Sequence, residues 1–140
     1  MMAGHNRSMN LFVCGALVFP EAMAAVAGQV FPFREGVLRG YAGFSLKHPN
    51  DAALIPFPDT CTGGMVYFEL GEEAVRRLDA FAGAFFRRVE VNVEAADGQW
   101  VEAEAYVLNM RHKKLLTATS WDQDEFRLKH LGKFLKHHGG

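Results

Sequence analysis

Long apolar runs, cysteine pairs and an excess charge of either sign are all missing from this 140-residue chain. No uninterrupted apolar stretch approaches the roughly 20 residues that cross a membrane. The first eight residues are polar and lack the apolar core of a secretory signal peptide. Lysine and arginine total 15 against 16 acidic residues, so no net field attracts nucleic acid or a membrane surface. We therefore expect a cytoplasmic protein without nucleic-acid or membrane partners.

Metal-binding patterns are missing too. The two cysteines, Cys14 and Cys61, form neither a disulfide framework nor a metal-ligand spacing. In a basic segment, His130 lies two helical turns before His137 and His138. This spacing is too far for His130 to share one ion with either of them. We expect no metal site. Cys14 lies in an apolar segment without a recognisable histidine partner, which favours a buried thiol over a nucleophile.

What the chain does contain is enough apolar residues, 49% of the total, for one compact domain with a real core. We expect a flexible N-terminal segment over 1–9 and a single domain over 10–138. Glycine-rich apolar and alternating runs predict about six or seven strands and two or three helices. The expected fold class is α+β, with a curled mixed β-sheet approaching a small barrel and flanking helices. The mouth of such a barrel is a usual place for a small-molecule pocket.

The first strand and helix have clear local signals. The apolar run 11–17 predicts a buried strand. Pro20 can open a helix that continues to Ala27 and stops at Gly28. Exposed backbone amides where the strand turns into this helix could hold a carboxylate or an oxyanion. An ordinary strand-to-helix corner is the alternative and the more common interpretation.

Proline, capping and alternation patterns predict the elements after the first helix. Three prolines over 48–62 predict a loop with one short strand at 54–55. Ser120 and Gln123 resemble a capping box that opens a C-terminal helix over about 121–138, whose leucines would pack on the barrel. The remaining expectations are bent strands over 31–47, strands over 65–70, 89–93 and 101–107, a helix after Glu72, and a hairpin turn at Asp97 and Gly98.

Several ordered segments carry a resemblance to a known family. Residues 11–23 resemble the opening motif of the family, and residues 36–41 resemble its second strand. Residues 64–67 resemble a later strand and residues 78–81 a helix. Residues 86–89 resemble the start of the strand that follows this helix. In order and spacing they resemble the gamma-glutamylcyclotransferase-like superfamily, in the branch with gamma-glutamylamine cyclotransferases and plant avirulence-induced proteins. The resemblance implies the family's barrel and a cofactor-free reaction. In that reaction, the α-amino group of a gamma-glutamyl compound attacks its own γ-carbonyl, giving 5-oxoproline and a released amine.

The resemblance also implies where the pocket lies and how it departs from the family. The opening motif usually reads Tyr-Gly-Ser/Thr-Leu, and its turn amides hold the glutamyl part. Its tyrosine falls on Cys14 and its serine or threonine on Ala16, while a later family tyrosine falls on Phe86. Each change removes a polar group. The residues expected to line a substrate or ligand pocket are Cys14, Gly15, Ala16, Leu17, Phe86 and Arg88.

The family's proton-shuttling glutamate falls on Ala82, and an alanine cannot move a proton. Loss of such a general base typically removes about 10²- to 10⁴-fold of the rate. Asp79 lies three residues earlier on nearly the same helical side and is a weak substitute; Glu21 and Glu90 are weaker. We therefore expect a catalytically silent or divergent binder of a small molecule, such as a gamma-glutamyl compound or another amino-acid derivative. Two alternatives stay open: an active cyclotransferase or acyltransferase with a substitute carboxylate, and an interaction protein with a filled interior.

Overall fold

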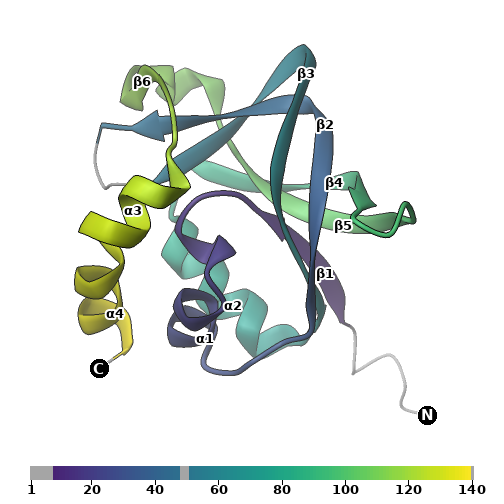
Figure 1. Cartoon of the computed structure of the whole chain (residues 1–140), viewed down its shortest axis with the longest axis vertical. Helices are drawn as coiled ribbons and strands as arrows, with labels where there is room; N and C mark the ends of the chain where they lie inside the picture. Colours follow the sequence, from purple (N-terminus) through teal and green to yellow (C-terminus); the bar gives the residue numbers. More distant parts are fainter. Residues whose placement is uncertain (1–7, 48–50, 140) are drawn as a thin grey trace.

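The computed structural model describes residues 8–47 and 51–139. Its strands are β1 (Met9–Val13), β2 (Phe33–Leu46), β3 (Ala52–Leu70), β4 (Phe86–Ala95), β5 (Trp100–Leu108) and β6 (Leu116–Ser120). Five of them close into a barrel in the order β1, β3, β2, β4 and β5, and β1 pairs with β5 in parallel to complete the ring (Figure 1). β6 pairs with β2 outside that ring. Residues 1–7 of the segment expected to be flexible lie outside the described residues, and β1 already begins at Met9.

Helices lie together on one side of the barrel. They are α1 (Pro20–Ala27), α2 (Glu72–Ala82), α3 (Gln123–Lys129) and α4 (Leu131–Gly139), with short 3-10 helices at Ala16–Val18 and Met110–Leu115. α1 contacts both α2 and α4 and lies between them (Figure 1). The expected α+β fold with a sheet curled into a small barrel is confirmed.

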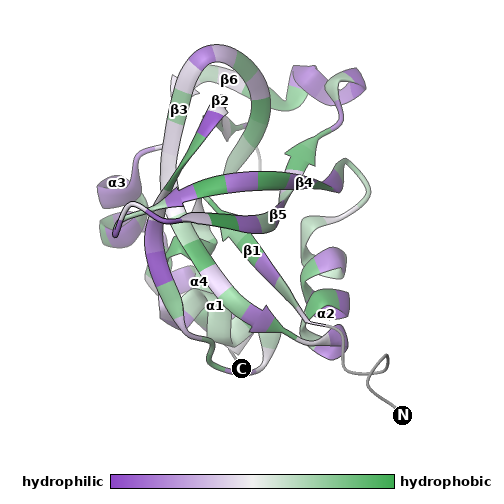
Figure 2. Cartoon of the chain, turned by 90° about the vertical axis from the view of Figure 1, so that its right-hand side faces the viewer, coloured by the Kyte–Doolittle hydropathy of each residue, from purple (hydrophilic) through white to green (hydrophobic). Residues whose placement is uncertain are grey.

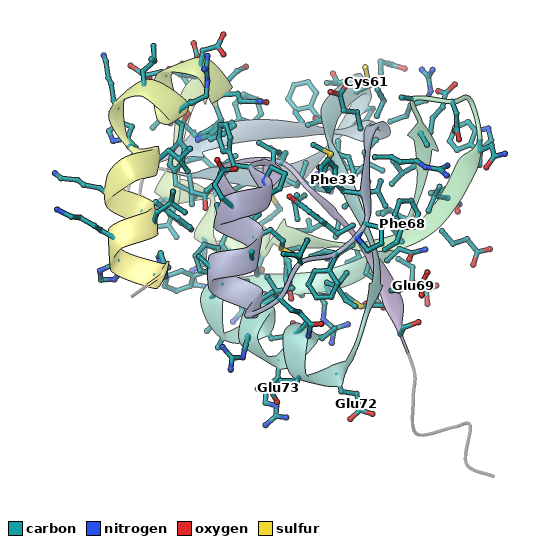
Figure 3. All side chains as sticks on the ribbon, turned by 60° about the horizontal axis from the view of Figure 1, so that its bottom comes forward. Phe33, Cys61, Phe68, Glu69, Glu72 and Glu73 are labelled. Atoms are coloured by element: carbon teal, nitrogen blue, oxygen red, sulfur yellow. The ribbon has the colours of Figure 1, made fainter. Side chains whose placement is uncertain are left out.

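Local signals position α1 and α2. Pro20 is the first residue of α1, and Gly28 ends it in the left-handed conformation with φ of 87°, as predicted. Glu72 and Glu73 occupy the first turn of α2, where carboxylates complement the helix dipole, and both project outward (Figure 3). Gly83, with φ of 81°, ends α2 directly after Ala82. The end of α2 is therefore fixed beside the start of β4.

Apolar side chains form separate clusters inside and outside the barrel. β4 and β5 alternate between hydrophilic and hydrophobic residues (Figure 2), as the sequence predicts for half-buried strands. Their inward residues, including Val93 and Ala105, pack with Phe12 in the interior. A second cluster lies between the barrel and the helices, and a third, smaller one includes Leu46 and Leu108.

Two paired glycines let strands of the barrel approach closely: Gly64 brings β3 close to β1, and Gly36 brings β2 close to Val93 of β4. Gly36 faces Gly64 across the β2–β3 ladder. A Cβ atom at Gly64 would overlap the carbonyl oxygen of Val13 and the ring of Phe12. Only glycine permits this approach, so the close packing of the barrel depends on it.

The loop expected over 48–62 is wrong from Ala52 onward, because β3 starts there and runs for 19 residues, and residues 48–50 lie outside the described residues. Pro58 is tolerated because pairing with β2 is interrupted around it, whereas Pro56 is the last paired residue before the interruption. Arg39 pairs with Cys61 and Tyr41 with Pro56, so residues 57–60 have no partner in β2. A proline without a ladder partner loses no hydrogen bond.

The single C-terminal helix is likewise replaced by two, α3 and α4, with a break at His130, where φ is −129°. Gly132, a poor helix former, follows two residues later. Ser120 is not the cap, since it belongs to β6 and pairs with Phe44. Instead, the Asp122 side chain accepts a hydrogen bond of 3.0 Å from the backbone N–H of Glu125.

Candidate ligand pocket

A cavity of about 200 Å³ opens at one end of the barrel, where residues of all three apolar clusters meet. Phe12 and Leu54 reach it from the barrel interior, and Leu46 from the third cluster. Three further phenylalanines line it: Phe81, Phe85 and Phe86. Its polar side chains are those of Cys14, Asp51 and Tyr106.

The turn after β1 binds a carboxylate that belongs to the chain itself. β1 ends at Val13, and Ala16–Val18 form a 3-10 helix, so the strand is shorter than the expected 11–17. Asp51 Oδ1 accepts hydrogen bonds from the backbone N–H of Ala16 (2.8 Å) and of Ala52 (2.7 Å). Gly15, with φ of 97°, passes so close that a Cβ there would overlap this carboxylate.

Burial raises the pKa of Asp51 to about 6, although the two backbone N–H donors partly offset the effect. None of the described residues that line the cavity is a lysine, arginine or histidine. On its other side, Asp51 borders a narrow crevice that is also lined by Asp122, Glu125 and His130. The cavity therefore presents a half-buried negative charge among apolar walls.

Cys14 contributes a thiol rather than a nucleophile. Burial raises its pKa to about 12, and the nearby charge of Asp51 adds to the shift. Since the thiolate is the reactive form, the thiol stays protonated and inert at neutral pH. This agrees with the expectation of an unreactive Cys14.

A second, shallower hollow adjoins the cavity along Ala82, Phe86 and Tyr106, which line both. Here the guanidinium of Arg88 donates to Asp79 Oδ1 at 2.9 Å and to Glu104 Oε1 at 2.6 Å. These interactions raise the pKa of Arg88, with the hydrogen bond to Asp79 as the largest cause. Asp79 also accepts a hydrogen bond of 2.7 Å from the Tyr106 hydroxyl.

The structure thus divides the residues expected at the site. Cys14, Leu17, Ala82 and Phe86 line the cavity. Gly15 and Ala16 support the Asp51 carboxylate from behind. Arg88 and Asp79 lie in the adjoining hollow and face each other instead of the cavity.

The two weaker carboxylate candidates lie elsewhere. Glu21 is exposed in the first turn of α1, and Glu90 is exposed on β4. Sequence reasoning missed Asp51 and Tyr106. Tyr106 had a detectable signal, because it is an aromatic residue on the otherwise polar face of an alternating strand. Asp51 had none, because it lies 35 residues from the amide that it binds.

Comparison with known proteins decides the family. A sequence model described as "Gamma-glutamyl cyclotransferase, AIG2-like" matches residues 11–123. The chain belongs to this family. Protein AIG2 C of Arabidopsis thaliana is 25% identical over 137 residues, which cover 97% of this chain and 82% of that protein. The resemblance found in the sequence is therefore confirmed.

Solved structures show the same fold. An Arabidopsis thaliana protein solved in solution superposes with a TM-score of 0.72 at 24% identity, covering 94% of this chain and 79% of that one. A solved structure named "Gamma-glutamyl cyclotransferase" superposes with a TM-score of 0.69 at 15% identity, and the match covers 95% of this chain and 81% of that one. A mouse AIG2-like protein superposes with a TM-score of 0.64 at 20% identity, and the match covers 83% of this chain and 89% of that one.

No group of three or more histidine, cysteine, aspartate or glutamate side chains in 8–47 and 51–139 is placed to hold a metal ion. None of the helices in these ranges is long and apolar enough to cross a membrane.

Proposed function

We propose that this family member binds a small, largely apolar molecule in the cavity beside Ala82 and does not form 5-oxoproline. The family resemblance places the proton-shuttling glutamate at Ala82, whose methyl group cannot accept or donate a proton. Without that relay, the attacking nitrogen cannot lose its proton to the leaving nitrogen. The open cavity also weighs against an interaction protein with a filled interior.

The hydrogen bond between Asp51 and Ala16 is the observation that carries the proposal. By resemblance, the amides of this turn hold the glutamyl part of family substrates. In this chain the Asp51 carboxylate occupies one of those amides, and its charge would repel a second carboxylate. A gamma-glutamyl substrate would therefore find no general base at position 82, and the turn that should bind it is occupied by Asp51.

The three carboxylates considered from the sequence, Asp79, Glu21 and Glu90, do not replace the lost relay. Asp79 is fixed by Arg88 and by the Tyr106 hydroxyl in the adjoining hollow. Glu21 and Glu90 are exposed and are not among the residues that line the cavity. These positions support a binding role rather than a rearranged catalytic centre.

Release of 5-oxoproline from gamma-glutamylethylamide, followed by mass spectrometry, tests the proposal. We expect the wild-type protein to give no product above buffer. The variant Ala82→Glu should also remain inactive, because Asp51 still occupies the turn. Product formation by the wild type would overturn the proposal. Product formation by Ala82→Glu alone would contradict the role assigned to Asp51.

Asp51 itself favours a second candidate, an active cyclotransferase with a substitute base. A carboxylate with a pKa near 6 can take the proton from the attacking amine as the new C–N bond forms. It would then return that proton to the leaving nitrogen as the original C–N bond breaks. This candidate requires wild-type turnover that falls about 10²- to 10⁴-fold in Asp51→Asn.

A further inference from the structure

Among the described residues, no cationic side chain lies on the cavity side of Asp51. Its Oδ1 accepts two backbone hydrogen bonds, whereas no hydrogen bond from the described residues reaches Oδ2. No side-chain nitrogen or oxygen in the described ranges is both fully buried and unpaired, so Oδ2 retains access to a solvent-sized space. Charges placed among apolar groups normally require a partner of opposite sign.

Retaining an ionised carboxylate here costs stability. A folded-state pKa near 6, above the ordinary 3.8, means that the fold favours the neutral acid. A neutral amide could accept the same hydrogen bond from Ala16 without that cost. Residues that oppose stability in this way are expected where a ligand uses them.

We infer that the cavity binds a small primary amine in its ammonium form, with the ammonium group against Asp51 and an apolar body against Phe81, Phe85 and Phe86. The inference rests on the proposed function, because it names the class of ligand for the same cavity. An ammonium supplies the positive charge that the described lining residues lack, together with hydrogen-bond donors for the Asp51 carboxylate.

The size of the cavity limits the apolar body. A cavity of about 150 Å³ accommodates benzene. The present volume of about 200 Å³ therefore suits one aromatic ring or a branched alkyl group with a short aminomethyl arm. Anions of the same size would face the Asp51 carboxylate and be repelled.

Three probes of matched shape test the inference: benzylamine, benzyl alcohol and benzoate, which are cationic, neutral and anionic at pH 7.5. Calorimetric titration should show that benzylamine binds about 10- to 100-fold more tightly than benzyl alcohol, as a charged hydrogen bond predicts. Benzoate should bind least. Shifts of the Ala16 and Ala52 amide resonances on adding benzylamine would locate it at Asp51.

Two variants separate the site from general charge effects. Asp51→Asn keeps the shape and the acceptor oxygen but removes the charge, so benzylamine should bind it no better than benzyl alcohol. Glu90→Gln removes an exposed carboxylate on β4 and should leave the benzylamine affinity unchanged. Circular dichroism of both variants establishes that they fold.

Lowering the pH gives a second readout without mutation. The preference for benzylamine should disappear in the wild type as pH falls through about 6, where Asp51 becomes neutral. Cys14 and Tyr106 face Asp51 in the cavity, and Asp122, Glu125 and His130 face it across the crevice. The pH effect therefore belongs to Asp51 only if Asp51→Asn abolishes it.

Equal affinities for the three probes, a preference for benzoate, or undetectable benzylamine binding at millimolar concentration would each overturn the inference. So would a benzylamine preference that survives in Asp51→Asn. These failures differ from failure of the proposed function. If the wild type forms 5-oxoproline yet prefers benzylamine, the proposed function is wrong and the amine site stands. If the wild type forms no 5-oxoproline and does not bind benzylamine, the amine site is wrong and the proposed lack of turnover stands.

Discussion

Asp51 Oδ1 lies 2.8 Å from the backbone nitrogen of Ala16, across a separation of 35 residues. The contact joins the start of β3 to the turn that follows β1, at the edge of the cavity. The Asp51 carboxylate therefore accepts a hydrogen bond from a backbone N–H group beside the cavity. Two properties of the protein should follow from this contact: its pH-dependent stability and its demand for glycine at position 15. The Asp51 charge also adds to the burial that keeps Cys14 unreactive.

Removing the charge of Asp51 should stabilise the protein at neutral pH. Because the folded-state pKa of about 6 exceeds 3.8, the stabilising proton is fully bound below about pH 4 and lost as pH rises through 6. Asp51→Asn should therefore raise the free energy of unfolding at pH 7.5 by up to about 3 kcal/mol, with little change at pH 4. Urea denaturation at both pH values measures this. A gain of the same size at both would contradict it.

Gly15→Ala should destabilise the fold strongly. A φ of 97° is unfavourable for any residue with a side chain, and the added Cβ would overlap the Asp51 carboxylate. We expect a loss of about 2–4 kcal/mol in urea denaturation, from backbone strain combined with overlap. Gly63→Ala is the matched control, because a Cβ there meets nothing within 4 Å, and its effect should stay within about 0.5 kcal/mol. Equal effects of the two substitutions would refute the packing described for Gly15.

Only one of the two cysteines should react with iodoacetamide. The pKa of Cys14 is raised to about 12, whereas Cys61 is exposed on β3, far from the labelled start of α2 (Figure 3). At pH 8 the native protein should take up one label, at Cys61. Mass spectrometry of Cys61→Ser should then show almost no labelling. Rapid modification of native Cys14 would instead indicate a reactive thiol in the cavity.

Local sequence signals predicted the elements whose boundaries depend on nearby residues. Pro20 and Gly28 fix the two ends of α1, and both ends were predicted. The prolines of β3 misled because their tolerance depends on β2, where the register shifts between Arg39 and Tyr41 and leaves Pro58 without a partner. Ser120 misled because pairing with Phe44 places it in β6.

The site was predictable only in part, for the same reason. The exposed amides around Gly15 indicated that this turn could hold a carboxylate, although an ordinary strand-to-helix corner was the more common interpretation. Which carboxylate fills it depends on how the β2–β3 hairpin folds back, and no local pattern around Asp51 records that. Asp79 seemed a plausible substitute by helical spacing alone, but Arg88 and Tyr106 hold it away from the cavity.

Nuclear magnetic resonance titration tests the central contact most directly. The Asp51 carboxyl carbon and the amide groups of Ala16 and Ala52 should shift together as pH changes, with a common midpoint near 6. In Asp51→Asn the two amides should lose that transition. If the Asp51 carboxyl carbon instead titrates with a midpoint near pH 4, and the two amides do not shift with it, Asp51 does not occupy the turn. The pocket described above would then be wrong.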